Sequence, residues 1–302
     1  MLWELLNEHG LSLDRLESFC LVAQAGGVTK AAKGDPAKQS LFSRQIKELE
    51  EFFGIELIRR KGRGIALTEA GERLNLIARD CFAALSDFKS GCKSRPVEVV
   101  IGTGDSVIQW LLMPRLDELR ERLPGVRLKF LNLPTAEAVK RVADGTIDFA
   151  LVRKDAVTRR LQTASLGTMT YSLFVPSGLG SAASRRDSLK ALDGTPLATL
   201  EGEGSFRSEL ASIAQKRGLA LNIQVECSSF PLAARAVAMG NVAAILPSIA
   251  AGDLAEVGVR ETRVPLLKRF EREMCLASSP RLVRIRPVLQ RVAAVLAETC
   301  RF

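Results

Sequence analysis

The stretch QSLFSRQIKELEEFFG, residues 39–54, decides how the N-terminal third of the chain folds. Wound into a helix at about 100° per residue, it gathers apolar side chains on one face: Phe42, Ile46, Leu49 and Phe53. The opposite face carries hydroxyls and cations along its first two turns: Ser40, Ser43, Arg44 and Lys47. An exposed helix usually mixes both signs of charge. This acid-poor face is therefore either a chance solvent surface or a contact for a polyanion.

The residues before this stretch predict a helix-turn-helix. Residues 13–25 place apolar side chains at helical spacing and end at Gly26-Gly27. Thr29 can open a short second helix, and Asp35-Pro36 supplies an N-cap followed by proline at the first helical position. Two short helices joined by a tight turn, the later one with a polar outer face, are typical of DNA-binding helix-turn-helix proteins.

A basic hairpin follows the quoted stretch. Short apolar segments at 55–58 and 65–67 flank RRKGRG, residues 59–64, which holds two glycines and four cations. This pattern predicts a β-hairpin wing whose tip neutralises backbone phosphates. The interpretation we favour for the polar helix face is therefore a DNA major groove, with the chance solvent surface as the alternative.

Residues 13–71 resemble the DNA-binding domain of LysR-type transcriptional regulators, through SFCLVAQAGGVTKAA and QSLFSRQIKELEEFFGIELIRRKGRGIALTEAG. The resemblance implies a winged helix-turn-helix over residues 1–68. The family usually has a leucine where Asp35 stands and a serine cap where Lys38 stands, so Asp35 takes over the cap and Lys38 becomes available for a phosphate. The DNA-binding candidates are Thr29, Lys38, Gln39, Ser40, Ser43, Arg44, Lys47, Arg60 and Arg63.

A long helix is expected at residues 69–92, with Thr68 as its cap and Glu69 and Glu72 in its first turn. An apolar stripe runs along it at near-heptad spacing: Leu74, Ile77 or Ala78, Cys81, Leu85 and Phe88. The stripe either packs on its own domain or pairs with a second copy. The family resemblance implies the second, with Leu74, Cys81, Leu85 and Phe88 joining a homodimer or homotetramer, and SGCKSRP, residues 90–96, forming a hinge.

From Val97 onward, apolar strands alternate with helices, including single helices expected at 107–123 and 280–298. The order βαβαβ occurs twice and predicts two α/β subdomains with mostly parallel sheets, one from 96–165 and 270–302 and one from 166–269. Residues 96–302 also resemble the effector-binding domain of the same family, which is similar to periplasmic binding proteins.

Ligands of open α/β sheets bind beyond the carboxyl ends of the strands, near helix N-termini. Hydroxyls occupy several such places in this chain, although serine and threonine also cap helices there with no ligand. The resemblance implies that Ser106, Thr135 and Ser205 contact a small effector, and Arg153 is a charge partner for an anion. The full set of ligand candidates is Thr103, Ser106, Thr135, Arg153, Ser205, Phe206 and Ser229.

Composition narrows the function. The 302 residues carry a net charge of +9, yet residues 1–95 hold 15 Lys and Arg against 13 Asp and Glu, so bulk charge does not locate the polyanion site. His9 is the single histidine, the six cysteines include no C-x-x-C pair, and no phosphate loop occurs. These observations disfavour an enzyme and a protein that binds a metal or cofactor. The leading hypothesis is therefore a ligand-responsive transcriptional regulator. The alternative is a small-molecule binding protein or transferase whose N-terminal helices merely associate.

The N-terminal sequence and the family resemblance also predict where the protein acts and what it binds. The N-terminus, MLWELLNEHG, is expected to form an amphipathic helix over residues 1–10. It lacks the basic start of a signal peptide, and no apolar run is long enough to span a membrane, so a cytoplasmic protein is expected. Double-stranded DNA, a small effector, RNA polymerase and a second copy of the chain are the expected partners.

Overall fold

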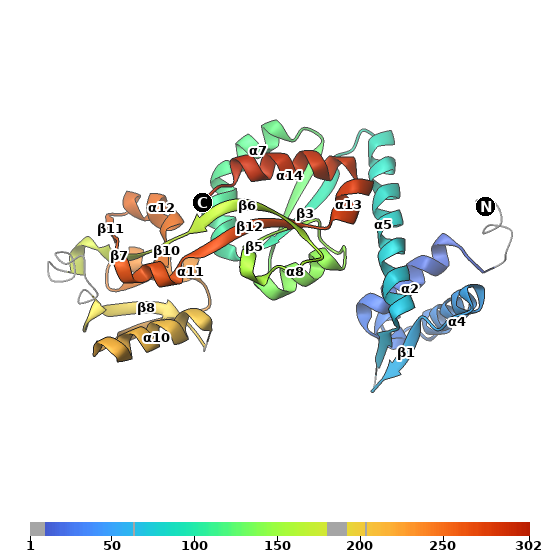
Figure 1. The fold of residues 1–302 in the computed structure, drawn as a ribbon, viewed down its shortest axis with the longest axis horizontal. Coiled ribbons are helices and arrows are strands. Elements are labelled where there is room, and N and C mark those ends of the chain that lie inside the picture. The colour runs from blue at the N-terminus through green and yellow to red at the C-terminus, as the bar shows by residue number, and fades with distance from the viewer. Residues whose placement is uncertain (1–9, 63, 180–191, 203) are drawn as a thin grey trace. The chain divides into compact units, whose positions relative to one another are not determined.

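The computed structural model describes residues 10–62, 64–179, 192–202 and 204–302 (Figure 1). The helix expected at residues 1–10 falls almost wholly outside these ranges, and so does Arg63. The chain forms two compact units, one of residues 1–95 with 144–146 and one of 96–143 with 147–302. Helices, a hairpin and two five-stranded sheets confirm the expected α/β class.

The first unit is a winged helix-turn-helix with a long helix at its end. Its elements in chain order are α2 (Leu13–Ala25), α3 (Val28–Ala31), α4 (Pro36–Phe53), β1 (Ile58–Lys61), β2 (Gly64–Leu67) and α5 (Glu69–Cys92). The antiparallel β1 and β2 form the expected wing. The small core of the first unit consists of Phe19, Val22, Ala32, Phe42, Ile46, Leu49 and Leu57.

Local residues set both ends of α4. Asp35 accepts hydrogen bonds from the backbone N–H of Ala37 (2.9 Å) and Lys38 (3.2 Å), and Gly54 ends the helix with φ of 65°. The expected cap is confirmed. Phe42, Ile46 and Leu49 are buried, while Phe53 at the end of the same face is 39% exposed. Phe53 lies in the last turn, past the core, where its ring meets Phe52 at 4.9 Å.

The long helix α5 begins in close contact with the strand segment before the wing. Thr68 caps it by accepting a bond from the Gly71 N–H (3.0 Å), and its hydroxyl donates to the Glu56 carbonyl (2.7 Å). A Cβ at position 71 would lie 2.0 Å from the Leu57 carbonyl oxygen, so only glycine fits there. This contact fixes the start of α5 on the domain.

The second unit contains two five-stranded sheets. The first has the order β4-β3-β5-β12-β6, with bounds β4 (Val126–Asn132), β3 (Val97–Thr103), β5 (Phe149–Arg153), β12 (Arg272–Ser278) and β6 (Gln162–Met169). The second has the order β11-β7-β10-β8-β9, with bounds β11 (Val259–Thr262), β7 (Tyr171–Pro176), β10 (Ala243–Pro247), β8 (Pro196–Leu200) and β9 (Asn222–Cys227).

In each sheet four strands run in one direction and one strand runs against them, so the expectation of mostly parallel sheets is confirmed. In the first sheet β3 runs parallel to β4 and β5, but β12 is antiparallel to both β5 and β6. In the second, β7 is antiparallel to β10 and β11. The chain crosses between the sheets at β6–β7 and again before β12, and a strand returning from the other sheet arrives antiparallel. Strand β6 also runs to Met169, beyond the expected boundary at residue 165.

The two long helices expected in this unit are both interrupted. The first is divided into α6 (Asp105–Val107), a π-helical turn (Ile108–Leu112), a 3-10 turn with Pro114, and α7 (Leu116–Arg122). The second is divided into α13 (Pro280–Ile285) and α14 (Pro287–Thr299). Proline disfavours helical geometry in the residue before it, and Arg286 accordingly has φ of −118° and ψ of 91°.

Helices cover both faces of each sheet. Figure 1 shows α7 and α14 on one side of the first sheet and α8 (Thr135–Ala143) on the other. The second sheet lies between α10 (Ser205–Arg217) on one side and α11 (Phe230–Ala238) with α12 (Ala251–Glu256) on the other. Separate buried apolar clusters fill the four faces, with Leu111 and Leu289 in one and Val139 and Cys275 in another.

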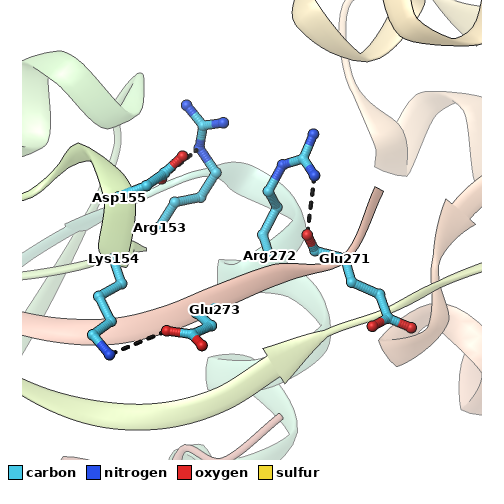
Figure 2. Close-up of a pocket in the computed structure, with 6 residues that line it drawn as sticks. All are labelled: Arg153, Lys154, Asp155, Glu271, Arg272 and Glu273. Atoms are coloured by element: carbon cyan, nitrogen blue, oxygen red, sulfur yellow. Dashed lines mark hydrogen bonds and ion pairs between the residues drawn. The ribbon is translucent and has the colours of Figure 1, made fainter. Parts of the chain in front are cut away.

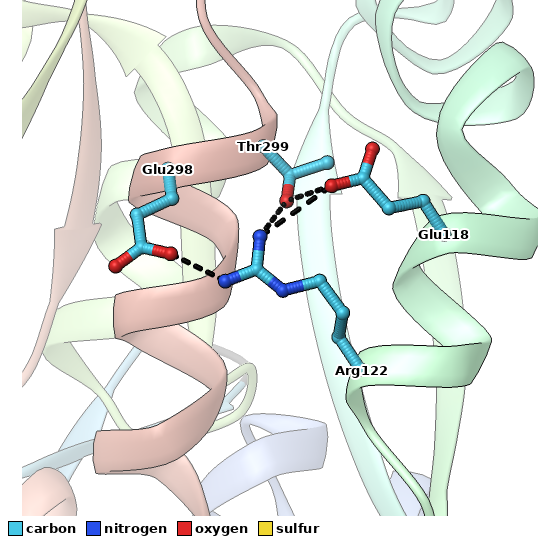
Figure 3. A network of polar contacts seen from close by, with 4 residues as sticks. All are labelled: Glu118, Arg122, Glu298 and Thr299. Carbon is cyan, nitrogen blue, oxygen red and sulfur yellow. Dashed lines mark hydrogen bonds and ion pairs between the residues drawn. The ribbon is translucent and has the colours of Figure 1, made fainter.

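Two polar networks join distant segments of the first sheet's subdomain. Arg286 forms a buried ion pair with Asp148, whose other oxygen accepts the Val100 N–H at 2.7 Å. In Figure 3, Arg122 of α7 pairs with Glu298 and donates to the Thr299 hydroxyl of α14 at 2.9 Å. Each network fixes the C-terminal helices onto elements that lie more than a hundred residues earlier in the chain.

Candidate functional site

The polar face of α4 is open along its length. Ser40, Ser43, Arg44 and Lys47 are all exposed. Arg44 lies 3.7 Å from Glu48 and Lys47 lies 3.5 Å from Glu51, both loose ion pairs between exposed side chains. Surface pairs of this kind contribute little to stability, so both cations can exchange their partner for a phosphate or a base.

The start of α4 carries the other candidates of the helix-turn-helix. Gln39 donates a hydrogen bond to the Thr29 hydroxyl at 3.1 Å, which joins α3 to α4. The expectation that Thr29 opens the second helix is wrong, because α3 begins at Val28 after Gly27. Lys38 is exposed and 4.0 Å from Asp35, so its ammonium is available for a phosphate.

The wing is positioned by a backbone contact with α2. The Ile65 N–H donates to the Gly26 carbonyl at 3.1 Å, and a Cβ at Gly64 would lie 2.8 Å from the same oxygen. Strand β1 exposes Arg59, Arg60 and Lys61. Arg59 and Lys61 were not among the sequence candidates, although the charge run RRKGRG was the signal that could have included them.

The apolar stripe of α5 divides into two parts. Ala78 is fully buried and Leu74 packs against the core of the first unit, so this end of the stripe covers its own domain. The remainder is exposed: Ile77 (63%), Leu85 (46%), Phe88 (72%) and Cys81. An exposed apolar row on a helix is typical of a surface that a partner covers.

The structure separates the ligand candidates of the second unit. Thr103 is fully buried, and its hydroxyl donates to the Leu151 carbonyl at 2.6 Å, which is a structural role. Ser229 is the N-cap of α11, accepting from the Leu232 N–H at 3.4 Å. Thr135 begins α8 and is half-buried. The side chain of Ser205 lies outside what the structure describes.

The structure brings other candidates together. Ser106 is a buried residue of α6, which packs against α11, and Phe206 in the first turn of α10 meets the Phe230 ring of α11 at 5.2 Å. Phe206 also lies 5.6 Å from Tyr171. Sequence reasoning missed Tyr171 and Phe230, and no local pattern singles them out because their partners are distant in the chain.

Arg153 lines a pocket of about 520 Å³ at the end of β5 and the start of β12 (Figure 2). The lining residues are Arg153, Lys154, Asp155, Glu271, Arg272 and Glu273. Three cations alternate with three carboxylates, and Lys154 is paired with Glu273 at 3.1 Å. Arg272, which the sequence did not single out, contributes a second guanidinium to this pocket. The volume of this pocket suits a small organic ligand.

The described part of the chain offers little metal or thiol chemistry. No group of three or more His, Cys, Asp or Glu side chains within it could hold a metal ion, and all six cysteines are unpaired. Burial raises the pKa of the Cys20 and Cys300 thiols to about 11, which keeps them protonated and unreactive near neutral pH. None of the helices in the described ranges is long and apolar enough to cross a membrane.

Two family models match the chain. Residues 13–72 match the helix-turn-helix of bacterial regulatory proteins of the lysR family, and residues 96–301 match the LysR substrate binding domain. Together they account for both units.

Related sequences include a probable nitrogen assimilation transcriptional activator of Synechococcus elongatus, 33% identical over 146 residues. That alignment spans 47% of this chain and 47% of the relative, so it covers about half of each protein. A probable hydrogen peroxide-inducible genes activator of Mycobacterium leprae is 25% identical over 241 residues, 78% of this chain and 78% of the relative.

Solved structures share the fold. A full-length OxyR variant from Pseudomonas aeruginosa superposes with a TM-score of 0.66 at 18% identity, covering 97% of this chain and 96% of that one. Full-length LysG from Corynebacterium glutamicum, with the effector Arg bound, gives a TM-score of 0.62 at 18% identity, covering 97% of this chain and all of that one.

Proposed function

The chain belongs to the LysR family of bacterial transcriptional regulators, and we propose that it binds operator DNA through the polar face of α4 and the basic wing. The observation that carries this proposal is the exposure of Ser40, Ser43, Arg44 and Lys47 on a helix whose opposite face is buried. A capped helix held on its domain can enter the major groove as one rigid surface. The protein then acts by binding rather than by catalysis, in the cytoplasm where its DNA lies.

A gel-shift assay with the DNA upstream of its own gene tests this proposal. Arg44→Ala removes a cation that no strong bond holds, and we expect about 1–3 kcal/mol weaker operator binding if Arg44 contacts a base. Arg73→Ala, an exposed arginine on α5, is the matched control and is expected to bind like the wild type. Unchanged affinity for Arg44→Ala would remove Arg44 from the interface.

We propose that residues 69–92 join two copies of the chain. The exposed row of Ile77, Cys81, Leu85 and Phe88 supports this, because a second copy would cover it. Leu85→Asp places a charge in that row and should dissociate the assembly in light scattering at micromolar concentration. Leu13→Asp, an equally exposed leucine on α2, is the control. A native assembly for Leu85→Asp would place the interface elsewhere.

We propose that the second unit, spanning 96–302, binds a small anionic effector and passes its occupancy to DNA binding and RNA polymerase. Ser106, Arg153 and Phe206 are the candidates the structure supports best, since they lie near helix N-termini and strand ends. Thr103 and Ser229 have structural roles that explain them without a ligand, and Thr135 and Ser205 stay candidates. An effector acts only through its different affinities for two conformations.

A further inference from the structure

Four aromatic rings from four separate segments meet at one end of the second sheet. Tyr171, the one tyrosine of the chain, lies 5.6 Å from Phe206, 5.9 Å from Phe230 and 6.1 Å from Phe270. Phe206 and Phe230 meet edge to face at 5.2 Å. We call these four residues the aromatic cluster.

The aromatic cluster is only partly covered. Phe270 is 1% exposed and belongs to the core, but Tyr171, Phe206 and Phe230 are half-buried. Phe206 and Phe230 stand in the first turns of α10 and α11. The cluster therefore offers aromatic surface to a ligand.

Two guanidiniums lie on one face of the first sheet, and one of them lies beside the aromatic cluster. Arg153 pairs with Met274, two residues from Arg272 on β12. Arg272 follows Phe270 by two residues, and its guanidinium donates to Glu209, three residues after Phe206 on α10. Paired residues share a face of a sheet, and faces alternate along a strand. Figure 2 agrees, because both guanidiniums extend to one side of the strand and Lys154 and Glu273 lie on the other.

The two arginines differ in how firmly they are held. Arg272 donates to the carbonyls of Arg269 (2.8 Å) and Glu271 (3.0 Å) and to the Glu209 carboxylate of α10 (3.1 Å). Arg153 has an ion pair with Asp155 at 3.9 Å, which is too long for a hydrogen bond. Arg153 can therefore receive a carboxylate, while Arg272 fixes the strand beside it.

The charges and the rings belong to one site. Burial raises the pKa of Tyr171 to about 12, while the positive charges of Arg272 and Arg153 act in the opposite direction on the same phenol. Both cations are thus near enough to the cluster for their field to be felt there.

We propose that the effector of this protein is an aromatic carboxylate, with its ring against Phe206 and Phe230 and its carboxylate on Arg153. This inference rests on the proposed effector function. A small hydrophilic anion would leave the aromatic surface in water, and a neutral ring would leave Arg153 without a strong partner. An aromatic carboxylate covers the aromatic surface with its ring and pairs with Arg153 through its carboxylate. A guanidinium binds a carboxylate bidentately, and aromatic rings pack edge to face or offset.

Thermal unfolding of the full-length chain with added ligand tests the chemical class. The probes are benzoate, phenylacetate and indole-3-acetate, each compared with its neutral amide, together with cyclohexanecarboxylate and acetate. We expect at least one aromatic acid to raise the melting temperature, with its amide and the two non-aromatic acids about tenfold weaker or inactive.

Substitutions test which residues the ligand contacts. Arg153→Gln should weaken the active acid about tenfold, and Arg153→Lys, which keeps the charge without the fork, should weaken it less. Arg127→Gln, an exposed arginine of β4 that does not line the pocket, is the matched control and should bind like the wild type. Phe206→Leu should weaken the aromatic acid severalfold.

Two outcomes would overturn the inference. The first is that no aromatic acid binds, or that amides and non-aromatic acids bind equally well. The second is that Arg153→Gln and Arg127→Gln bind the active acid equally. Neither outcome contradicts the proposed binding of operator DNA. That proposal fails separately if the full-length chain without ligand does not shift the DNA upstream of its gene in a gel-shift assay.

Discussion

The polar face of α4 and the aromatic cluster show two ways of building a binding surface. The first lies on one helix of 18 residues, and its side chains face the same way because of helical geometry alone. The second draws Tyr171, Phe206, Phe230 and Phe270 from four segments spread over a hundred residues. A surface on one helix depends on that helix's cap and core, whereas an assembled surface depends on every contact that holds its segments.

The largest expected effect is on the assembled region. Arg286→Ala leaves Asp148 as a buried charge without its ion-pair partner, which should cost about 3–5 kcal/mol. Hydrogen exchange should rise in peptides of β3 and α14 and stay unchanged in α4. Arg127→Ala, which breaks an exposed pair with Glu98, is the control and should cost less than about 1 kcal/mol. Equal losses in both variants would contradict the buried role of Arg286.

The next effect concerns Tyr171 and needs no substitution, because the chain has a single tyrosine. Near-ultraviolet absorbance should show the phenol ionising near pH 12 in the folded chain, against about 10 in denaturant. Folding favours the neutral phenol, so stability from Tyr171 is complete below pH 10 and declines as the pH rises toward 12. Tyr171→Phe should lack this decline. A folded-state pKa near 10 would mean that the cluster is open to water.

The smallest effect is expected on α4. Asp35→Ala removes the acceptor of the Ala37 and Lys38 N–H groups and should cost about 1 kcal/mol, detected as faster exchange in the first turn of α4. Asp35→Asn keeps an acceptor and should lose less. If Asp35→Ala also loosened the second unit, the two regions would not be independent in the way that their contacts indicate.

The sequence by itself determined what depends on neighbours along the chain. It predicted the cap at Asp35, the ends of α4, the wing and the span of α5, because capping, helical spacing and glycine turns act within a few residues. It did not predict the divisions near Pro114 and Pro287, because a proline can stand in the first turn of a helix or interrupt one, and packing decides which.

Only the tertiary structure decided the ligand region. Strand β12 returns antiparallel into the first sheet and sets Arg272 beside Arg153. The tertiary structure also shows that the Thr103 hydroxyl donates a hydrogen bond to the Leu151 carbonyl. It brings the rings of Tyr171 and Phe230 against Phe206. Such neighbours come from strand register and sheet order, which are set by long-range burial and leave no mark at fixed spacing in the sequence.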